Sequence, residues 1–153
     1  MKKSLSIIQG IISSMSEHEE QVALFEWARY STNIYPELEF MYAIPNGAKL
    51  PYIRNARGNR FSPQALKLKA EGLHPGIPDI CLPCARGAYH ALYIELKAGN
   101  NKPTAEQRYC LDGLNNMGNL AVWCIGADNA RLVIETYLRL PPGQRFTSNA
   151  CHY

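Results

Sequence analysis

Three residues of the sequence, Asp79, Glu95 and Lys97, have types and a spacing that could support chemistry. Asp79 leads an apolar stretch, and the other two lie in 91–97, a predicted strand that is otherwise suited to a core. Because side chains alternate between the faces of a strand, Glu95 and Lys97 point the same way. Burying both charges costs solvation energy. We expect Asp79, on a neighbouring strand, and a divalent cation between Asp79 and Glu95 to compensate for this cost.

Such a cation would be Mg²⁺ or Mn²⁺, because hard cations bind through one or two carboxylates together with a substrate phosphate. A cation in this position can generate a hydroxide and neutralise a phosphate that is being cleaved. Lys97 carries only donors and cannot hold the metal. We expect it to orient the attacking water or to counter charge on the phosphate. Alternatively, a Glu and a Lys two residues apart on a strand are typical of a solvated edge.

The ordered set Gly76-x-Pro78-Asp79 and then Glu95-x-Lys97 resembles the signature of the PD-(D/E)xK nuclease superfamily. It is more narrowly similar to the VRR-NUC (virus-type replication-repair nuclease) family, and the resemblance runs from about Ser16 to Leu140. This resemblance implies an α/β fold with the PD-(D/E)xK (restriction-endonuclease-like) core, in the order αβββαβ, and a central mixed sheet flanked by helices. It also implies that the backbone carbonyl of Leu96 is a further metal ligand.

A helix is predicted from Glu17 to about Tyr30, because Ser16 and Glu19 fit a capping box. In VRR-NUC sequences Glu-x-x-x-Gln opens this helix and faces the metal site, which implies site roles for Glu17 and Gln21. Glu17 would bind metal directly or through water, Gln21 would bond that water or a phosphate oxygen, and Glu20 is an adjacent substitute. Alternatively, the acids of this first turn only favour the positive end of the helix dipole.

The stretch from Phe40 to Ala70 has six basic residues and no acidic one, although the whole chain has a net charge of only +3. A concentration of positive charge with interleaved aromatic and amide side chains is typical of nucleic-acid binding. A solvated loop and helix face is the alternative, and Asn46 with the glycine after it also fits a simple turn. The predicted DNA-binding residues of this stretch are Asn46, Lys49, Arg54, Arg57, Arg60, Lys67 and Lys69.

The remaining elements follow from apolar runs and capping signals. Strands are predicted at 38–44, at 78–80 with Cys81 on the same strand, at 91–97 and at 120–125, and 49–61 is predicted as a long loop. Helices are predicted from Pro63 to the residues before Gly72, from Pro103 to about Gly118, and from an Asp128 cap to Leu138. Thr104 and Gln107 satisfy a capping pattern. Because VRR-NUC proteins carry a Gln at the matching place, Gln107 is also assigned to DNA binding near the site.

At 153 residues the chain is long enough for one domain, and 46% hydrophobic with 19% charged residues is typical of a globular protein. We expect an amphipathic N-terminal extension at 1–15, a nuclease domain at 16–140 and a C-terminal tail at 141–153, loose from residue 144. No convincing secretory signal and no stretch of membrane-spanning length are seen. The five cysteines are therefore expected to be free thiols in the cytoplasm of a bacterial or phage-infected cell.

An alternative metal site consists of Cys81 and Cys84 with His74 and His90 as four zinc ligands. Their spacing matches no common zinc module well.

The resemblance implies a metal-dependent, structure-selective DNA endonuclease that binds no membrane. The chain is similar to phage and prophage members of the family. They are associated with branched DNA, four-way (Holliday) junctions in particular, and act as homodimers. A two-fold dimer would place two sites across a symmetric junction. The alternatives are a nuclease that prefers flaps or other DNA structures and a non-catalytic nucleic-acid-binding module.

Overall fold

The structure is a computed structural model that describes residues 15–45 and 53–153. The predicted N-terminal extension and two predicted DNA-binding residues, Asn46 and Lys49, lie outside the described residues, except for Met15 at the end of the extension. None of the described helices combines the length and apolar character needed to span a membrane.

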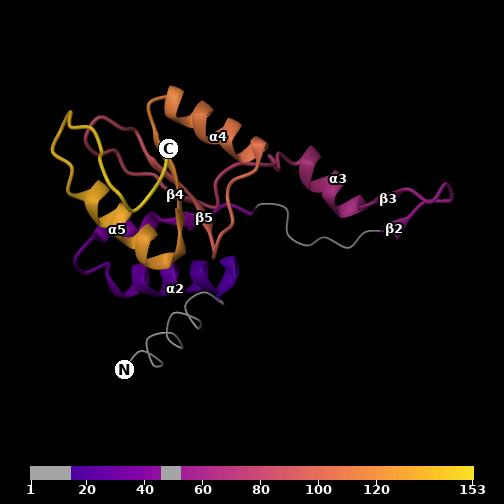
Figure 1. Ribbon diagram of the computed structural model, residues 1–153, viewed down its shortest axis with the longest axis horizontal. Helices are drawn as coiled ribbons and strands as arrows, with labels where there is room; N and C mark the ends of the chain where they lie inside the picture. Colours follow the sequence, from indigo (N-terminus) through magenta and orange to yellow (C-terminus); the bar gives the residue numbers. More distant parts are fainter. Residues whose placement is uncertain (1–14, 46–52) are drawn as a thin grey trace.

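A mixed sheet of four strands forms the centre of the fold, as predicted (Figure 1). Its order is β1 (Tyr42–Ala43), β4 (Ile80–Leu82), β5 (Leu92–Lys97) and β6 (Leu120–Ile125). The pairs β1–β4 and β4–β5 are antiparallel, whereas β5 and β6 are parallel. The parallel pair requires a crossover, which α4 (Ala105–Asn116) provides.

Helices cover both faces of this sheet. Figure 1 shows α4 on one side, and α2 (Glu17–Tyr30) together with α5 (Gly126–Leu138) on the other. Alternate residues of β5, Leu92, Ile94 and Leu96, are at most 1% exposed and join the apolar cluster that includes Leu24 of α2 and Val133 of α5. The period of two therefore directs Tyr93, Glu95 and Lys97 to the opposite face.

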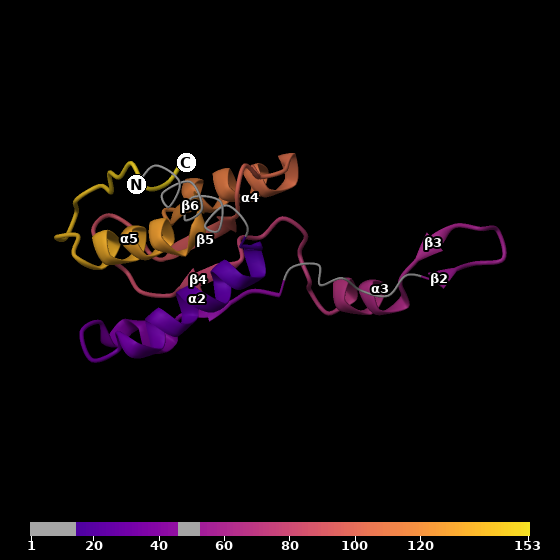
Figure 2. The same ribbon diagram turned by 60° about the horizontal axis from the view of Figure 1, so that its bottom comes forward.

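A segment of residues 53–72, here called the arm, extends away from the sheet (Figures 1 and 2). It consists of a hairpin of β2 (Ile53–Arg54) and β3 (Arg60–Phe61) followed by α3 (Pro63–Ala70). Within the arm only Ser62 is buried, and its hydroxyl accepts the backbone N–H of Ala65 and so caps α3. The part of the predicted 49–61 loop that the structure describes is thus a hairpin, with antiparallel pairing that the sequence pattern did not reveal.

The strand predicted at 38–44 is wrong for most of its length. Residues Pro36–Phe40 form a 3₁₀ helix, η1, and only Tyr42–Ala43 pair as a strand. Pro36 occupies the first turn, where its fixed φ suits a helical turn. Leu38 is buried while Phe40 is 67% exposed, so a run that looks apolar does not lie wholly in the core.

The last helix begins earlier than predicted, and Asp128 does not cap it. The helix α5 starts at Gly126 without a side-chain cap from its own segment. The carboxylate of Glu20 on α2 accepts the backbone N–H of Ala127 at 2.7 Å instead. A carboxylate at a helix N-terminus satisfies an otherwise unpaired donor and complements the helix dipole. Glu20 therefore has a structural role as a cap for α5.

The expectation of a loose segment from residue 144 is also wrong. Phe146 and Cys151 are buried, at 3% and 6% exposure, and join the central apolar cluster. The backbone of His152 pairs with that of Trp123 through two hydrogen bonds of 2.9 Å, and the two rings stack. The end of the chain thereby covers the otherwise open edge strand β6.

Candidate active site

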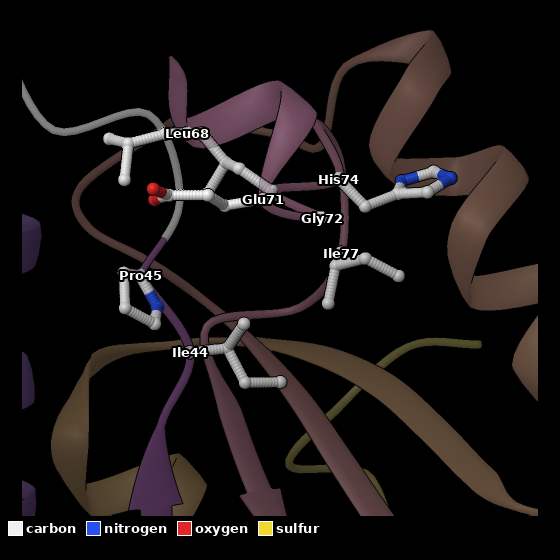
Figure 3. A pocket seen from close by; sticks show the side chains of 8 residues that line it. Ile44, Pro45, Leu68, Glu71, Gly72, His74 and Ile77 are labelled. Carbon is white, nitrogen blue, oxygen red and sulfur yellow. The ribbon is translucent and has the colours of Figure 1, made fainter. Parts of the chain in front are cut away.

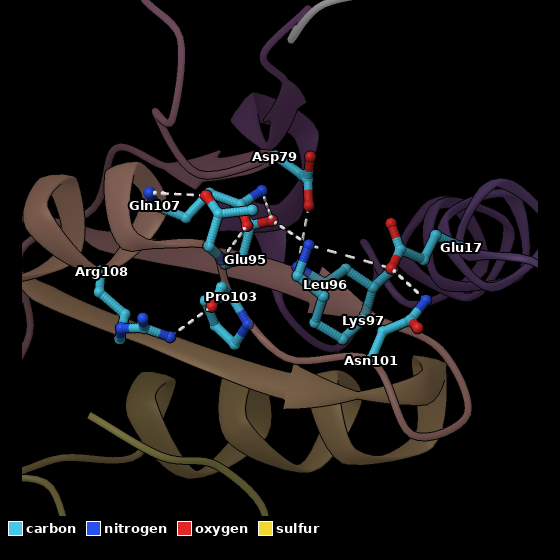
Figure 4. Close-up of polar contacts among 10 residues, drawn as sticks. Glu17, Asp79, Glu95, Leu96, Lys97, Asn101, Pro103, Gln107 and Arg108 are labelled. Atoms are coloured by element: carbon cyan, nitrogen blue, oxygen red, sulfur yellow. Dashed lines mark hydrogen bonds and ion pairs between the residues drawn. The ribbon is translucent and has the colours of Figure 1, made fainter.

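Asp79 lies where the pairing of β4 and β5 stops. The last register pair on this side is Ile80 with Ile94, so the backbone N–H of Leu96 lies beyond the ladder. The Asp79 carboxylate accepts that N–H at 2.9 Å (Figure 4). This bond fixes the acid against the strand that carries Glu95 and Lys97. The pairing of β4 with β5 therefore brings Asp79 close to Glu95 and Lys97, as the sequence predicted.

Glu95 and Lys97 form a buried ion pair rather than a solvated edge pair. Their exposed fractions are only 1% and 6%, and the Lys97 ammonium lies 2.7 Å from Oε1 of Glu95. A buried pair of this kind stabilises only when its hydrogen bonds are satisfied. The second oxygen of Glu95, Oε2, is buried and has no hydrogen-bond partner among residues 15–45 and 53–153. An unsatisfied buried acceptor costs about 1–3 kcal/mol, so Oε2 favours a partner that the described side chains do not supply.

The acidity of Glu95 reflects the same environment. Burial first, and then the negative charge of Asp79, raise the pKa of Glu95 from its usual 4.5 to about 7, against the lowering effect of Lys97. Taking a carboxylate out of water disfavours its charged form, and a like charge nearby adds to that effect. A strongly perturbed carboxyl beside a second acid is a common property of active sites.

Glu17, at the start of α2, reaches the same region from another element (Figure 4). Its Oε1 lies 3.9 Å from the Lys97 ammonium and accepts an N–H from the side chain of Asn101 at 3.1 Å. Gln21 lies one turn further along α2 and is half-buried. Ser16 and Glu19 form the predicted capping box that fixes this end of the helix. Asn101 was not predicted, because nothing in the sequence distinguishes it from other polar loop residues.

Gln107 has two partners within the chain. Its Oε1 accepts the backbone N–H of Thr104 at 2.9 Å, and the Thr104 hydroxyl accepts the backbone N–H of Gln107 at 3.2 Å, so the predicted capping box is confirmed. Its Nε2 donates to Oε1 of Glu95 at 2.5 Å. Figure 4 shows Gln107 and Lys97 approaching the Glu95 carboxylate from different directions. The predicted role in DNA contact stays a prediction.

The donor set fits a hard cation in part. Asp79 and Glu95 supply carboxylate oxygens, and the unpaired Oε2 of Glu95 is the kind of atom that a cation would satisfy. Across residues 15–45 and 53–153, however, no three His, Cys, Asp or Glu side chains gather as a ligand set. This observation removes the zinc alternative as well, and all five cysteines are free thiols. The backbone, water, substrate or a shift of Glu17 could supply further ligands.

The arm carries the predicted basic residues that the structure describes, and all of them are exposed: Arg54, Arg57, Arg60, Lys67 and Lys69. Arg54 lies directly opposite Arg60 in the hairpin, an arrangement that like charges disfavour. The turn between them is held by the Asn55 side chain, which accepts the backbone N–H groups of Arg57 and Asn59 at 3.0 and 2.9 Å. Lys67 makes an exposed ion pair with Glu71 at 3.7 Å.

A cleft of about 420 Å³ separates the base of the arm from the sheet (Figure 3). Ile44 and Pro45 form one side, and Leu68, Leu73 and Ile77 contribute apolar walls. The backbone N–H of Ile44 donates to the carbonyl of Asp79 at 2.7 Å, which ties this cleft to the acid. The cleft therefore lies between the base of the arm and the residues that follow β1, and Asp79 is bonded to one of its lining residues through the backbone.

Comparison with known proteins gives a consistent result. The profile of the VRR-NUC domain matches residues 15–128. A solved structure titled "VRR_NUC domain protein" superimposes with a TM-score of 0.66 at 29% sequence identity, over 84% of this chain and 93% of that chain. No curated protein gives a significant match. The mixed sheet and its flanking helices are those of the matched structure, which confirms the predicted fold class.

Proposed function

Since the chain belongs to the VRR-NUC family of nucleases, we propose that it is a Mg²⁺- or Mn²⁺-dependent endonuclease that hydrolyses phosphodiester bonds in branched DNA. The observation that carries this proposal is the state of Glu95. Its carboxylate is 1% exposed and lies next to Asp79 and Lys97, and its Oε2 has no hydrogen-bond partner in the part of the chain that the structure describes. A buried acceptor oxygen without a hydrogen-bond partner is better explained as a metal ligand than as part of an ion pair that only stabilises the fold.

In this proposal Asp79 and Glu95 hold the metal, with the backbone carbonyl of Leu96 and the Glu17 carboxylate as further ligands. A bound divalent ion would activate water and neutralise negative charge on the phosphate. Lys97 orients that water or stabilises charge on the phosphate, because its buried ammonium is aimed at the carboxylates from within the sheet. Gln21 bonds a water or a phosphate oxygen near the start of α2.

DNA binding is assigned to the arm. Its exposed arginines and lysines can neutralise phosphates, and the hairpin keeps Arg54 and Arg60 side by side despite their repulsion. A two-stranded hairpin is also narrow enough to enter a major groove. The DNA path would run from the arm, past the cleft at its base, to Asp79. Asn46 and Lys49 would extend the same contact.

We further propose that the substrate is a four-way junction and that the protein acts on it as a homodimer. The support is the family resemblance together with symmetry, because two copies related by a two-fold axis would present two sites to a symmetric junction. Solution scattering or sedimentation of the free protein, and then of its complex with a junction, measures the number of copies. A single copy in the junction complex would contradict the dimer.

A cleavage assay tests the activity. Labelled four-way junctions, flaps and linear duplexes are incubated with the protein and Mg²⁺ or Mn²⁺, or with EDTA. We expect metal-dependent cutting that is fastest on the junction, and a loss of about 10²–10³-fold in Asp79→Ala. Asp112→Ala, which changes an exposed acid on α4, serves as the matched control and should cut normally.

Each other outcome of this assay has a definite meaning. Equal rates on the three substrates would reject the junction preference, and a faster rate on flaps would favour the flap alternative. Tight binding without any cutting would favour a non-catalytic binding module. Cutting that survives Asp79→Ala would remove the proposed mechanism.

A further inference from the structure

The side-chain amide of Gln107 connects a helix cap to the candidate catalytic acid. Its oxygen is engaged by the backbone N–H of Thr104, so its NH₂ group is directed toward Oε1 of Glu95. The reverse orientation of the amide would bring two donors together at Thr104 and two acceptors together at Glu95. The assignment of the amide atoms is therefore fixed by its partners.

We propose that Gln107 is a positioning residue for Glu95. This inference rests on the proposed nuclease function and assigns Gln107 a role within the site instead of contact with DNA. Oε1 of Glu95 receives two donors, the Gln107 amide at 2.5 Å and the Lys97 ammonium at 2.7 Å. Together they fix the plane of the carboxylate and leave Oε2 as the oxygen that is available to a cation.

The cap of α4 makes this position rigid. Gln107 and Thr104 bond reciprocally, and the following turn of α4 is anchored by Cys110 and Leu111, which are 7% and 2% exposed. The amide thus approaches Glu95 from a packed helix and not from a flexible loop. Groups that orient a metal ligand typically change metal affinity or activity by about 10–100-fold when they are removed.

Two substitutions separate positioning from simple helix stability. Gln107→Ala removes the donor to Glu95 and one half of the capping box, whereas Thr104→Ala removes the other half and keeps the amide on Glu95. Both should lower the melting temperature by a few degrees, because each removes one capping bond. Only Gln107→Ala should disturb the metal site.

The measurements are Mn²⁺ binding by titration calorimetry on the DNA-free full chain, and kcat and KM for cleavage. We expect Gln107→Ala to weaken Mn²⁺ binding about tenfold or more and to lower kcat with little change in KM for DNA. Thr104→Ala should keep both the Mn²⁺ affinity and kcat within about twofold of the unmodified protein. A contact to DNA would instead raise KM.

Three results would overturn the inference: normal Mn²⁺ affinity in Gln107→Ala, an equal loss in Thr104→Ala, or a change confined to KM. Failure of the proposed function is a different result, because the unmodified protein itself would then show no Mn²⁺ binding and no cutting.

Discussion

The site on the sheet and the arm use positive charge in opposite ways. In the site, Lys97 is 6% exposed and lies 2.7 Å from a buried carboxylate. In the arm, the basic side chains are exposed, and Arg54 faces another arginine across the hairpin. Coulomb interactions are strong where water is excluded and weak where it screens them. We infer that the site is built for chemistry at one point and the arm for contact with an extended polyanion.

The two regions differ in packing as well as in charge. The strand β5 lies between two neighbours and is covered by helices, whereas no residue of α3 is buried. Segments with few buried apolar contacts open at low free-energy cost. The geometry of Asp79, Glu95 and Lys97 should therefore be insensitive to what happens in the arm. The following predictions test this separation.

The largest difference is expected when one lysine is removed from each region. Lys97→Met leaves Glu95 buried without its cation, so we expect the free energy of unfolding to fall by about 3 kcal/mol at pH 8. Lys67→Met removes only an exposed helix pair and should change it by less than about 0.5 kcal/mol. Urea denaturation in EDTA measures both values. Similar losses in the two variants would show that the buried ion pair contributes no more to the free energy of unfolding than the exposed pair does.

A second effect concerns pH in the metal-free protein. The pKa of Glu95 is raised from 4.5 to about 7, so the folded state binds this proton more tightly than the unfolded state does. The stability that this proton contributes is fully present below about pH 4.5 and is lost as the pH rises through 7. The pKa difference corresponds to about 3 kcal/mol. Unfolding measured between pH 5 and 8.5 should show this decrease, and Glu95→Gln should abolish most of it.

A rise in stability from pH 5 to 8.5 that is seen in the unmodified protein and not in Glu95→Gln would contradict a raised pKa for Glu95. The arm offers a control here, because changes to its exposed arginines should leave the pH profile of stability unaltered.

The smallest expected effect is on DNA affinity. Replacing Arg54, Arg57 and Arg60 by Gln should weaken junction binding about tenfold to a hundredfold at about 0.1 M salt. The slope of log Kd against log salt should decrease by about three, or about one for each phosphate contact. The rate of cutting of bound DNA should stay within about twofold. The same three-charge change at Arg29, Arg131 and Arg145 is the control, and equal shifts in both variants would reject a specific role for the arm.

The sequence was most informative where a relation is local. The period of two placed Glu95 and Lys97 on one face, and capping patterns three residues long located Ser16 with Glu19 and Thr104 with Gln107. The same local reasoning failed at 38–44, where an apolar run forms a 3₁₀ turn. It failed again at 144–153, where Phe146 and Cys151 pack into the core. Composition alone does not reveal which surface such a segment will cover.

Thus the sequence by itself determined the candidate residues Asp79, Glu95 and Lys97, the order of most elements and the basic character of 40–70, because residue types, spacings and short local patterns carry these features. The tertiary structure decided that Asn101 bonds Glu17 from 84 residues away and that Glu20 caps a helix 107 residues further on. It also decided that Gln107 bonds Glu95 and that Oε2 of Glu95 finds no partner among the described residues. Such contacts depend on how the sheet and helices are packed against one another, and residue type and local spacing do not encode that arrangement in a readable form.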